Sequence, residues 1–283
     1  MADQMAGRVC MVTGANAGIG RVTALVLARM GATVIMVCRN RERSEPVLRE
    51  IRQATGNQEV HLMIADFASQ RSIRELAAAF RRRYDRLDVL VNNAGAINFD
   101  RSLTEDGLET TFAVNHLGYF LLTNLLLDRL VASAPARVIN VSSNAHRAGR
   151  IDFDDLQGAR RYSGWKAYAQ SKLANILFTV ELARRLEGTG VTVNALHPGF
   201  VSSNFATGTP LSRLGMRLLR PFTITPEKGA ETSIYLATSP EVEGVTGRYF
   251  VRKRVVEPAP AATDPAAARR LWQVSAELTG LPG

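Results

Sequence analysis

Short apolar runs alternate with longer amphipathic segments over the first two thirds of the chain. The apolar runs are continuous and rich in β-branched residues, as in strands that are buried on both faces of a sheet. The segments between them repeat apolar positions at helical spacing. In residues 69–84, one helix face collects Ile73, Leu76, Ala77, Phe80 and Tyr84. This alternation requires crossover connections and predicts a parallel sheet that helices cover on both sides.

The same pattern predicts the boundaries of the elements. Strands are expected at residues 9–13, 33–38, 60–64, 87–91, 137–141 and 191–196, with 247–251 as an edge strand. Helices are expected at residues 18–30, 41–55, 69–84, 165–186 and 266–278, and over most of 103–130. An insert at 144–164 and the stretch 200–225 depart from this rhythm. We therefore expect an α/β fold class with one domain over residues 1–283 and a single doubly wound parallel sheet.

Composition excludes several classes of protein. Of the 283 residues 46% are hydrophobic and 22% charged, which excludes disorder and coiled coils. No apolar run reaches the roughly 18–20 residues that span a bilayer, and the first residues lack the pattern of a secretion signal. Cys10 and Cys38 both lie in apolar runs, where buried, inert thiols are expected. These features predict a cytoplasmic globular protein without a stable membrane anchor.

The charge is strongly basic but not of a nucleic-acid-binding type. The formal net charge is +9, and the basic residues, mostly arginine, are spread along the chain. No Cys/His finger and no interleaving of aromatic with basic residues occurs, so no nucleic-acid partner is expected. The four histidines form no ligand-spaced cluster, so no metal site is expected either. Binding of an anionic cofactor is a more economical role for some of this charge.

A glycine-rich turn, T-G-A-N-A-G-I-G at residues 13–20, lies between the first predicted strand and the first predicted helix. Residues without a Cβ let backbone N–H groups approach a pyrophosphate, and the helix N-terminus adds a partial positive charge. The turn lacks the Lys-Ser/Thr pair of a nucleotide-triphosphate loop. A purely structural tight turn is the alternative, but the strand–turn–helix context favours dinucleotide binding.

Tyr168 and Lys172 are four residues apart in a predicted helix, so both project from one face. A lysine ammonium can stabilise a phenolate and bring the pKa of the tyrosine towards neutrality, which suits proton transfer. The fifth predicted strand ends in Ser142 and Ser143, either of which can supply a hydroxyl that polarises a carbonyl group.

T-G-x-x-x-G-I-G, N-N-A-G at residues 92–95 and Y-x-x-x-K together resemble the short-chain dehydrogenase/reductase family. A similarity to its retinol-dehydrogenase-like branch lies in four further phrases: A-N-A at 15–17, V-C-R-N at 37–40, S-K-L-A-N at 171–175 and the tail around Leu271 and Trp272. The resemblance covers a core of residues 8–251, leaves 252–283 as an extension, and implies a Rossmann-type fold. It implies an NADP(H)-dependent oxidoreductase that interconverts a lipophilic ketone or aldehyde with its alcohol. The resemblance further implies that Tyr168 transfers the proton and that Ser143 rather than Ser142 binds the carbonyl group. It also implies that Asn115 holds a water molecule that links Lys172 to solvent.

The resemblance also implies the cofactor contacts. An acidic residue after the second strand binds the ribose of NAD, whereas Arg39 stands there and can bind a 2′-phosphate. Asp66 matches the residue that binds adenine, although it can also cap a helix. Ser203 replaces the usual threonine. The implied cofactor-binding residues are Gly14, Asn16, Gly18, Ile19, Gly20, Arg39, Asn40, Asp66, Phe67, Asn93, Ala94, Gly95, Tyr168, Lys172, Pro198, Gly199, Val201 and Ser203.

Residues 211–222 form a basic amphipathic pattern within 200–225, the place of a mobile lid over a lipophilic substrate in this family. An ordinary surface helix or a contact with a membrane surface are the alternatives. Members of the family often form homodimers or homotetramers through the helices around Asn115 and Tyr168. A protein that binds NADP(H) without catalysis, as a regulator or interaction partner, is the alternative function.

Overall fold

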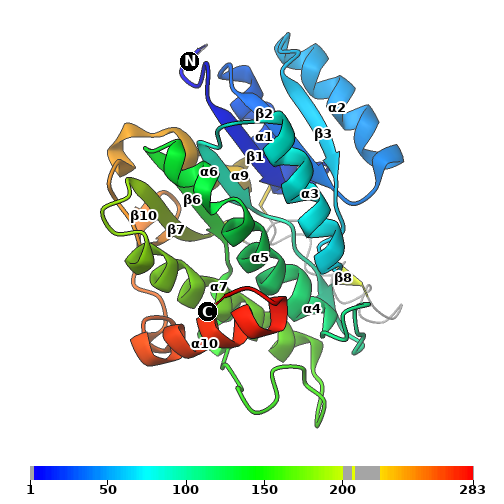
Figure 1. The fold of residues 1–283 in the computed structure, drawn as a ribbon, viewed down its shortest axis with the longest axis vertical. Helices are drawn as coiled ribbons and strands as arrows, with labels where there is room; N and C mark the ends of the chain where they lie inside the picture. Colours follow the sequence, from blue (N-terminus) through cyan, green and yellow to red (C-terminus); the bar gives the residue numbers. More distant parts are fainter. Residues whose placement is uncertain (1–2, 200–205, 208–223, 283) are drawn as a thin grey trace.

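The computed structural model describes residues 3–199, 206–207 and 224–282 of the chain, and a twisted sheet lies at its centre (Figure 1). Its eight strands run in the order β10-β9-β7-β6-β4-β1-β2-β3, and all neighbours are parallel except β9 and β10. The strands are β1 (Val9–Thr13), β2 (Thr33–Cys38), β3 (Val60–Ile64), β4 (Val89–Asn92), β6 (Ala136–Val141), β7 (Val191–His197), β9 (Tyr249–Val251) and β10 (Arg254–Val255). Chain order reverses between β1 and β4, the place where such sheets bind ligands at the carboxyl ends of their strands.

Helices cover both faces of the sheet, as the sequence predicts. One face carries α1 (Gly18–Arg29), α2 (Arg41–Thr55) and α9 (Pro226–Thr238), which share a core that includes Leu27, Ile51 and Leu236. The other face carries α3 (Gln70–Arg83), α5 (Gly118–Leu125) and α7 (Gly164–Arg185). On this second side α10 (Pro265–Thr279) lies across α7, outside the sheet layer (Figure 1). The doubly wound α/β fold is thereby confirmed.

The predicted helix over most of 103–130 is broken into several pieces. Residues 103–109 turn back on themselves, with a bridge between Leu103 and Glu109 and a φ of 74° at Gly107. The Glu109 carboxylate accepts hydrogen bonds from the first N–H groups of the helix, which therefore begins at Thr110. The pieces are α4 (Thr110–Phe112), a π-helical turn η1 (Ala113–Leu117), α5, and α6 (Leu127–Ala132).

The sequence prediction also missed two elements of the last third of the chain, strand β10 and helix α9. The stretch 247–251 is not the edge, because β10 pairs with β9 after a tight turn in which Arg252 and Lys253 have positive φ angles. Helix α9 was not anticipated, although its start carries a recognisable signal. Thr225 caps it, and proline occupies its first turn.

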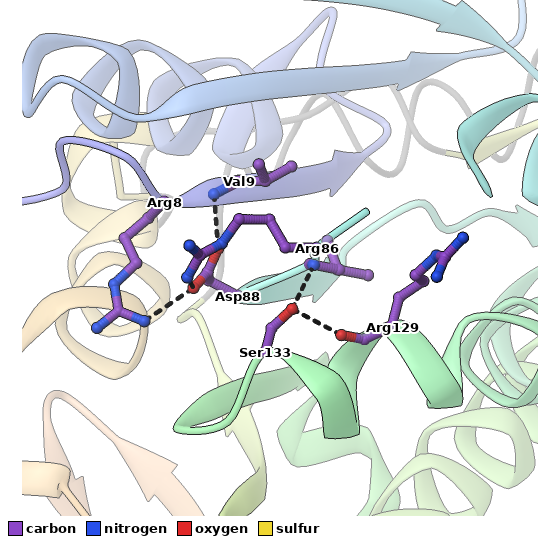
Figure 2. A network of polar contacts seen from close by, with 7 residues as sticks. Arg8, Val9, Arg86, Asp88, Arg129 and Ser133 are labelled. Atoms are coloured by element: carbon purple, nitrogen blue, oxygen red, sulfur yellow. Dashed lines mark hydrogen bonds and ion pairs between the residues drawn. The ribbon is translucent and has the colours of Figure 1, made fainter. Parts of the chain in front are cut away.

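Asp88 ties together the segments at the amino end of β4 (Figure 2). Its carboxylate is 2% exposed and accepts hydrogen bonds from Arg8 Nη1, from Arg86 Nε and Nη2, and from the backbone N–H of Val9. Next to it, Ser133 Oγ accepts from the N–H of Leu87 and donates to the carbonyl of Arg129 (Figure 2). These contacts fix the start of β4 against β1 and α6, at the opposite end of the strands from the glycine turn.

Cys10 and Cys38 are both buried and free, as expected. Burial raises the pKa of both thiols, so neither is set up as a nucleophile. Within the described ranges, no helix combines the length and the apolar character needed to cross a membrane.

Candidate active site

The loop between β1 and α1 adopts a backbone that favours glycine at three positions. Gly14 and Gly18 have φ angles of 67° and 53°, a region that residues with a Cβ rarely occupy. A Cβ on Gly20 would collide with the carbonyl oxygen of Gly14, so the first turn of α1 packs directly on the loop. Asn16 and Ile19 lie half-buried in the same loop and turn. The loop therefore presents bare backbone at the carboxyl end of β1, as the approach of a diphosphate requires.

Thr13 and Asn93 hold this loop against the end of β4. Thr13 Oγ1 accepts hydrogen bonds from the N–H groups of Asn93 (2.8 Å) and Ala94 (2.9 Å). In return, Asn93 Nδ2 donates to the Thr13 carbonyl oxygen at 2.8 Å, so the side-chain amide of Asn93 is engaged by the loop itself. Sequence reasoning did not single out Thr13. The available signal was a hydroxyl side chain at the last position of the strand, directly before Gly14.

The N-terminus of α1 has no side-chain cap. Ala17 occupies the N-cap position, and the first turn holds no acidic residue. Side chains do cap α2, α3, α9 and α10, at Asn40, Ser69, Thr225 and Asp264. The N–H groups and the positive dipole end of α1 therefore meet the glycine loop without a competing side chain at Ala17, which fits a diphosphate.

Arg39 is exposed at the end of β2. Its neighbours are engaged in helix α2: Asn40 Oδ1 accepts from the N–H of Arg43 at 2.8 Å, and Arg41 pairs with Glu45 at 3.2 Å. Any contact of the Asn40 side chain with a ligand would have to compete with this cap. Arg39 thus places a cation at the end of β2, at the same edge of the sheet as the glycine loop.

Asp66 and Phe67 follow β3 and have different surroundings. Asp66 Oδ1 accepts from the N–H of Ala68 at 2.9 Å, and Ser69 is the residue that caps α3. Asp66 therefore closes a turn and is not the helix cap. The Phe67 side chain lies in the core against Gly118, where a Cβ would stand 2.6 Å from its ring. A contact of Phe67 with a cofactor is thereby limited to its backbone.

Ser143, Tyr168 and Lys172 come together at the carboxyl end of β6. The side chains of Tyr168 and Ser143 are hydrogen-bonded to each other. Lys172 Nζ lies 5.6 Å from the centroid of the Tyr168 ring and donates to the Val141 carbonyl oxygen at 3.0 Å. The two serines are now distinguished. Ser142 is buried and its hydroxyl donates to the Lys172 carbonyl oxygen at 2.6 Å, which leaves Ser143 as the serine beside Tyr168.

Burial dominates the ionisation of this pair. It raises the pKa of Tyr168 to about 12, although the hydrogen bond with Ser143 acts in the opposite direction. It lowers the pKa of Lys172 to about 7, so the ammonium group gives up its proton far more readily than that of an exposed lysine. The sequence predicted a lowered pKa for Tyr168, because residue spacing reveals the lysine but not the desolvation of the phenol.

Asn115 lies in the π-helical turn η1 and faces the same site. Its Oδ1 accepts from the N–H of Ala96 at 2.8 Å, while Nδ2 donates to the Ala96 carbonyl at 2.9 Å and to Ser171 Oγ at 3.0 Å. Asn115 thus fixes the backbone that follows the N-N-A-G turn. Turns of π-helix are rare and frequently occur at functional sites.

The N-N-A-G turn connects the glycine loop with the lysine. A Cβ on Gly14 would stand 3.0 Å from the Cα of Ala94, and a Cβ on Gly95 would stand 3.7 Å from Lys172 Nζ and 3.3 Å from Asn115 Oδ1. The glycine loop and the Ser143–Tyr168–Lys172 group therefore share one edge of the sheet, separated by a single turn.

The segment after β7 is described only in part. Pro198 and Gly199 follow the strand, and Gly199 has a φ of 98°. Val201, Ser203 and most of the predicted lid lie outside the described residues. Ala206–Thr207 (β8) are described and pair with Ile97–Asn98 (β5), which places them just beyond the N-N-A-G turn.

Trp165 was not identified from the sequence. Its side chain is 52% exposed at the start of α7, and its ring centroid lies 6.0 Å from that of Tyr168. An exposed indole next to the central tyrosine provides an apolar surface at the site. The only sequence signal was a tryptophan three residues before Tyr168. In the part of the chain that the structure describes, no cluster of His, Cys, Asp and Glu could hold a metal ion.

Comparisons with known proteins agree with this architecture. A family model for short chain dehydrogenase matches residues 8–211. Retinol dehydrogenase 13 from Homo sapiens is 50% identical over 282 residues, which cover 97% of this chain and 85% of that protein. Retinol dehydrogenase 14 from Homo sapiens is 49% identical over 294 residues, which cover 98% and 88%.

Solved structures are similar as well. An uncharacterized protein from Mycobacterium Paratuberculosis has a TM-score of 0.80 at 37% identity, over 98% of this chain and 94% of that one. A short chain dehydrogenase from Shigella flexneri 2a, complexed with NADP, has a TM-score of 0.72 at 26% identity, over 90% and 100%. This chain therefore belongs to the short-chain dehydrogenase/reductase family, in its retinol-dehydrogenase-like branch, and is an oxidoreductase of alcohol and carbonyl groups.

Proposed function

We propose that this protein is an NADP(H)-dependent enzyme that interconverts a lipophilic aldehyde or ketone with its alcohol. The observation that carries the proposal is the convergence of Ser143, Tyr168 and Lys172 one turn away from a glycine loop that fits a diphosphate. When bound, the nicotinamide supplies or accepts the hydride. The residues of the chain bind the substrate oxygen and move its proton.

In the direction of reduction, the Tyr168 hydroxyl donates its proton to the carbonyl oxygen of the substrate, and the Ser143 hydroxyl donates a hydrogen bond to the same oxygen. A phenol with a pKa of about 12 is a weak acid, so the phenolate that remains needs a positive charge nearby. Protonated Lys172 supplies that charge. The Asn115 side chain holds the backbone of Ala96 close to Lys172. We propose that a water molecule beside Asn115 and Lys172 passes a proton from solvent back to Tyr168.

Replacement of Tyr168 tests the proposed chemistry. Tyr168→Phe removes only the hydroxyl, so we expect kcat to fall by about 100- to 10,000-fold while the Kd for NADPH stays within twofold. Reduction of all-trans-retinal is the assay, chosen from the names of the relatives. Tyr235→Phe, which removes an exposed hydroxyl bonded to Glu241, is the control and keeps its activity. Unchanged turnover in Tyr168→Phe would overturn the mechanism.

Arg39 supports a preference for the phosphorylated cofactor. Because Arg39 is exposed at the end of β2 and the first acidic residue after the strand is Glu42, the site attracts a 2′-phosphate and lacks the carboxylate that would bind a free ribose hydroxyl. We expect Arg39→Ala to weaken NADPH binding about tenfold, or about 1.4 kcal/mol, and to leave NADH binding unchanged.

Fluorescence titrations with NADPH and NADH measure these affinities. Arg49→Ala removes the same charge from an exposed position further along α2 and serves as the matched control. A similar loss of NADPH affinity in both variants would indicate general charge attraction and would contradict a specific phosphate contact. Tight NADPH binding without turnover of any carbonyl probe would instead favour a non-catalytic regulator.

The substrate is proposed to be lipophilic because Trp165 exposes its indole beside Tyr168 and the relatives are named retinol dehydrogenases. Trp165→Ala should raise the KM for all-trans-retinal several-fold, with little change in the KM for a small aldehyde. Equal changes for both substrates would argue against an apolar contact at this residue.

A further inference from the structure

A second buried polar group, which the mechanism above does not use, lies on the opposite side of α7 from the glycine loop. It consists of His116 in η1, Asn175 in α7 and Ser275 in α10, and none of these side chains is more than 1% exposed. His116 Nε2 lies 2.9 Å from Ser275 Oγ, and His116 Nδ1 lies 3.4 Å from Asn175 Oδ1. Asn175 Nδ2 donates to the Val141 carbonyl oxygen at 3.3 Å.

The direction of each hydrogen bond follows from the last one. The Val141 oxygen can only accept, so the Asn175 amide must turn its NH₂ group towards it and its Oδ1 towards His116. An acceptor facing Nδ1 requires the proton of the imidazole to sit on Nδ1. Nε2 is then an acceptor, and the Ser275 hydroxyl donates to it. In all three hydrogen bonds the donor is therefore the partner nearer to α10 and the acceptor is the partner nearer to Val141.

His116 has the protonation state that this chain of bonds needs. Burial lowers its pKa to about 4, so the imidazole is neutral, with one donor and one acceptor nitrogen. Aromatic rings surround it, with centroid distances of 5.0 Å to Phe112, 6.4 Å to Phe120 and 6.1 Å to Phe178. A neutral polar ring in such surroundings is tolerated because both of its nitrogens are hydrogen-bonded.

This chain of hydrogen bonds ends at the Val141 carbonyl oxygen, which also binds Lys172. The Val141 carbonyl oxygen accepts from Asn175 Nδ2 and also from Lys172 Nζ at 3.0 Å, so its two lone pairs serve the two donors. Lys172 is 4% exposed, and in the part of the chain that the structure describes its ammonium group donates to this carbonyl. Movement of Asn175 would therefore change the bond that positions Nζ.

We propose that Ser275 and His116 are positioning residues, which act through Asn175 and the Val141 carbonyl to hold Lys172 beside Tyr168. This inference rests on the proposed function and assigns a part in it to α10, which lies outside residues 8–211 matched by the family model. Two successive residues of the turn η1 contribute to the site: Asn115 bonds to the backbone of Ala96, and His116 bonds to Ser275 of α10.

Ser275→Ala tests the inference, because it removes one hydroxyl and adds no bulk. We expect kcat for reduction of all-trans-retinal to fall about fivefold, the factor that corresponds to about 1 kcal/mol for one hydrogen bond, while the Kd for NADPH stays unchanged. Thr279→Val is the matched control. It removes another buried hydroxyl from α10, whose hydrogen bonds among the described residues are to backbone carbonyls of its own helix, and it should keep the wild-type kcat.

Two further measurements separate positioning from general stabilisation. In the nitrogen NMR spectrum of the protein without cofactor, His116 should show the Nδ1–H tautomer, and its Nε2 resonance should move downfield in Ser275→Ala but not in Thr279→Val. His116→Phe keeps an aromatic ring in the pocket and should lower kcat at least as much. Adding Ser275→Ala to it should then cost nothing more, because the two residues act in one chain.

An Nε2–H tautomer in the wild-type protein, equal kcat values for Ser275→Ala and Thr279→Val, or additive losses in the double variant would each overturn the inference. The NMR measurement does not depend on turnover. If the wild-type protein reduces no carbonyl probe, the proposed function fails while the tautomer result still decides whether the chain of bonds exists.

Discussion

Within the described residues, Lys172 is a buried lysine without an anionic partner. It is 4% exposed, and its ammonium group donates to a backbone carbonyl, so burial lowers its pKa from 10.5 to about 7. The unfolded chain keeps this proton up to its ordinary pKa, whereas the folded protein releases it near pH 7. Between these values the unfolded state binds more protons, so the contribution of Lys172 to stability rises with pH. Below pH 7 the full cost of the buried charge remains.

Lys172→Met should therefore stabilise the fold while it abolishes activity. The methionine fills similar space without a charge, so we expect the free energy of unfolding to increase by about 1–4 kcal/mol near pH 6.5. The gain should shrink as the pH approaches 10, because wild-type Lys172 is then neutral in the folded protein. Urea unfolding of both proteins at about pH 6.5 and pH 9.5 measures this difference. A gain that is independent of pH would contradict the lowered pKa.

Individual side chains could be predicted where a backbone position determines them. Gly14 and Gly18 need positive φ angles, and the sequence identified both. It could not separate Ser142 from Ser143 without the family resemblance, because only packing brings the Lys172 carbonyl to the first of them. It also missed Thr13 and Asn175, whose polar atoms bond to residues more than 30 positions away.

At the scale of elements, the start of α1 contrasts with that of the capped helices. An N-cap side chain stabilises a helix by about 1 kcal/mol, yet the N-cap residue of α1 is Ala17, whose side chain makes no capping hydrogen bond. Asp264 supplies such a cap to α10 through hydrogen bonds from Ala266 and Ala267. A carboxylate at residue 17 would occupy the same N–H groups, and would carry the same charge, as a bound diphosphate.

Ala17→Asp should consequently stabilise the fold and weaken the binding of NADPH. We expect the free energy of unfolding without cofactor to rise by about 1 kcal/mol, and the affinity for NADPH to fall by about tenfold or more. Thermal unfolding and fluorescence titration measure the two effects. Ala17→Gly, which adds no charge, is the control and should alter the stability only slightly. Tighter NADPH binding in Ala17→Asp would show that the helix terminus does not face the phosphates.

Elements with continuous β-branched sequences were the most predictable. The ranges of β1, β2 and β3 agree with the predictions. For β1 and β2 the reason is burial of both faces, which leaves such runs few alternatives, whereas β3 lies at the edge of the sheet and is only partly buried. The apolar spacing of the segment 103–109 predicts a helix, but the Leu103–Glu109 bridge folds this segment back and the Glu109 cap makes the helix begin only at Thr110. Local periodicity does not report such side-chain competition.

On the scale of the whole molecule, the carboxyl ends and the amino ends of the strands carry different groups of residues. The carboxyl ends of the strands hold the glycine loop and the Ser143–Tyr168–Lys172 group, and the amino ends are fixed by the Asp88 network (Figure 2). Burial alone would raise the pKa of Asp88, but hydrogen bonds from Arg86, Val9 and Arg8 outweigh it and lower the pKa below 3.8. The ionised carboxylate therefore stabilises the fold above its ordinary pKa, and this contribution is lost as the pH falls through the lowered value.

Asp88→Asn should destabilise the protein by about 2–3 kcal/mol near pH 7, a moderate value because both arginines remain partly exposed. The difference from wild type should narrow as the pH falls from 3.8 through the lowered pKa of Asp88, because the unfolded wild-type chain takes up this proton before the folded protein does. Chemical unfolding across this range is the measurement. Asp85→Asn, three residues away and exposed, provides the control and should have little effect. A constant difference at all pH values would exclude the charge as its source.

Helix α10 also has a consequence for the order in which the protein is made. Trp272 packs on Phe120 and Phe178, and Arg185 stacks on its indole at 4.1 Å, so the outer side of α7 is covered by a segment that follows every described strand in the sequence. During synthesis, a chain that already contains the whole sheet still exposes these aromatic rings and leaves His116 without Ser275. We therefore expect a growing chain to pass through a stage with a complete glycine loop and an open aromatic face, at which association with other nascent chains competes with completion.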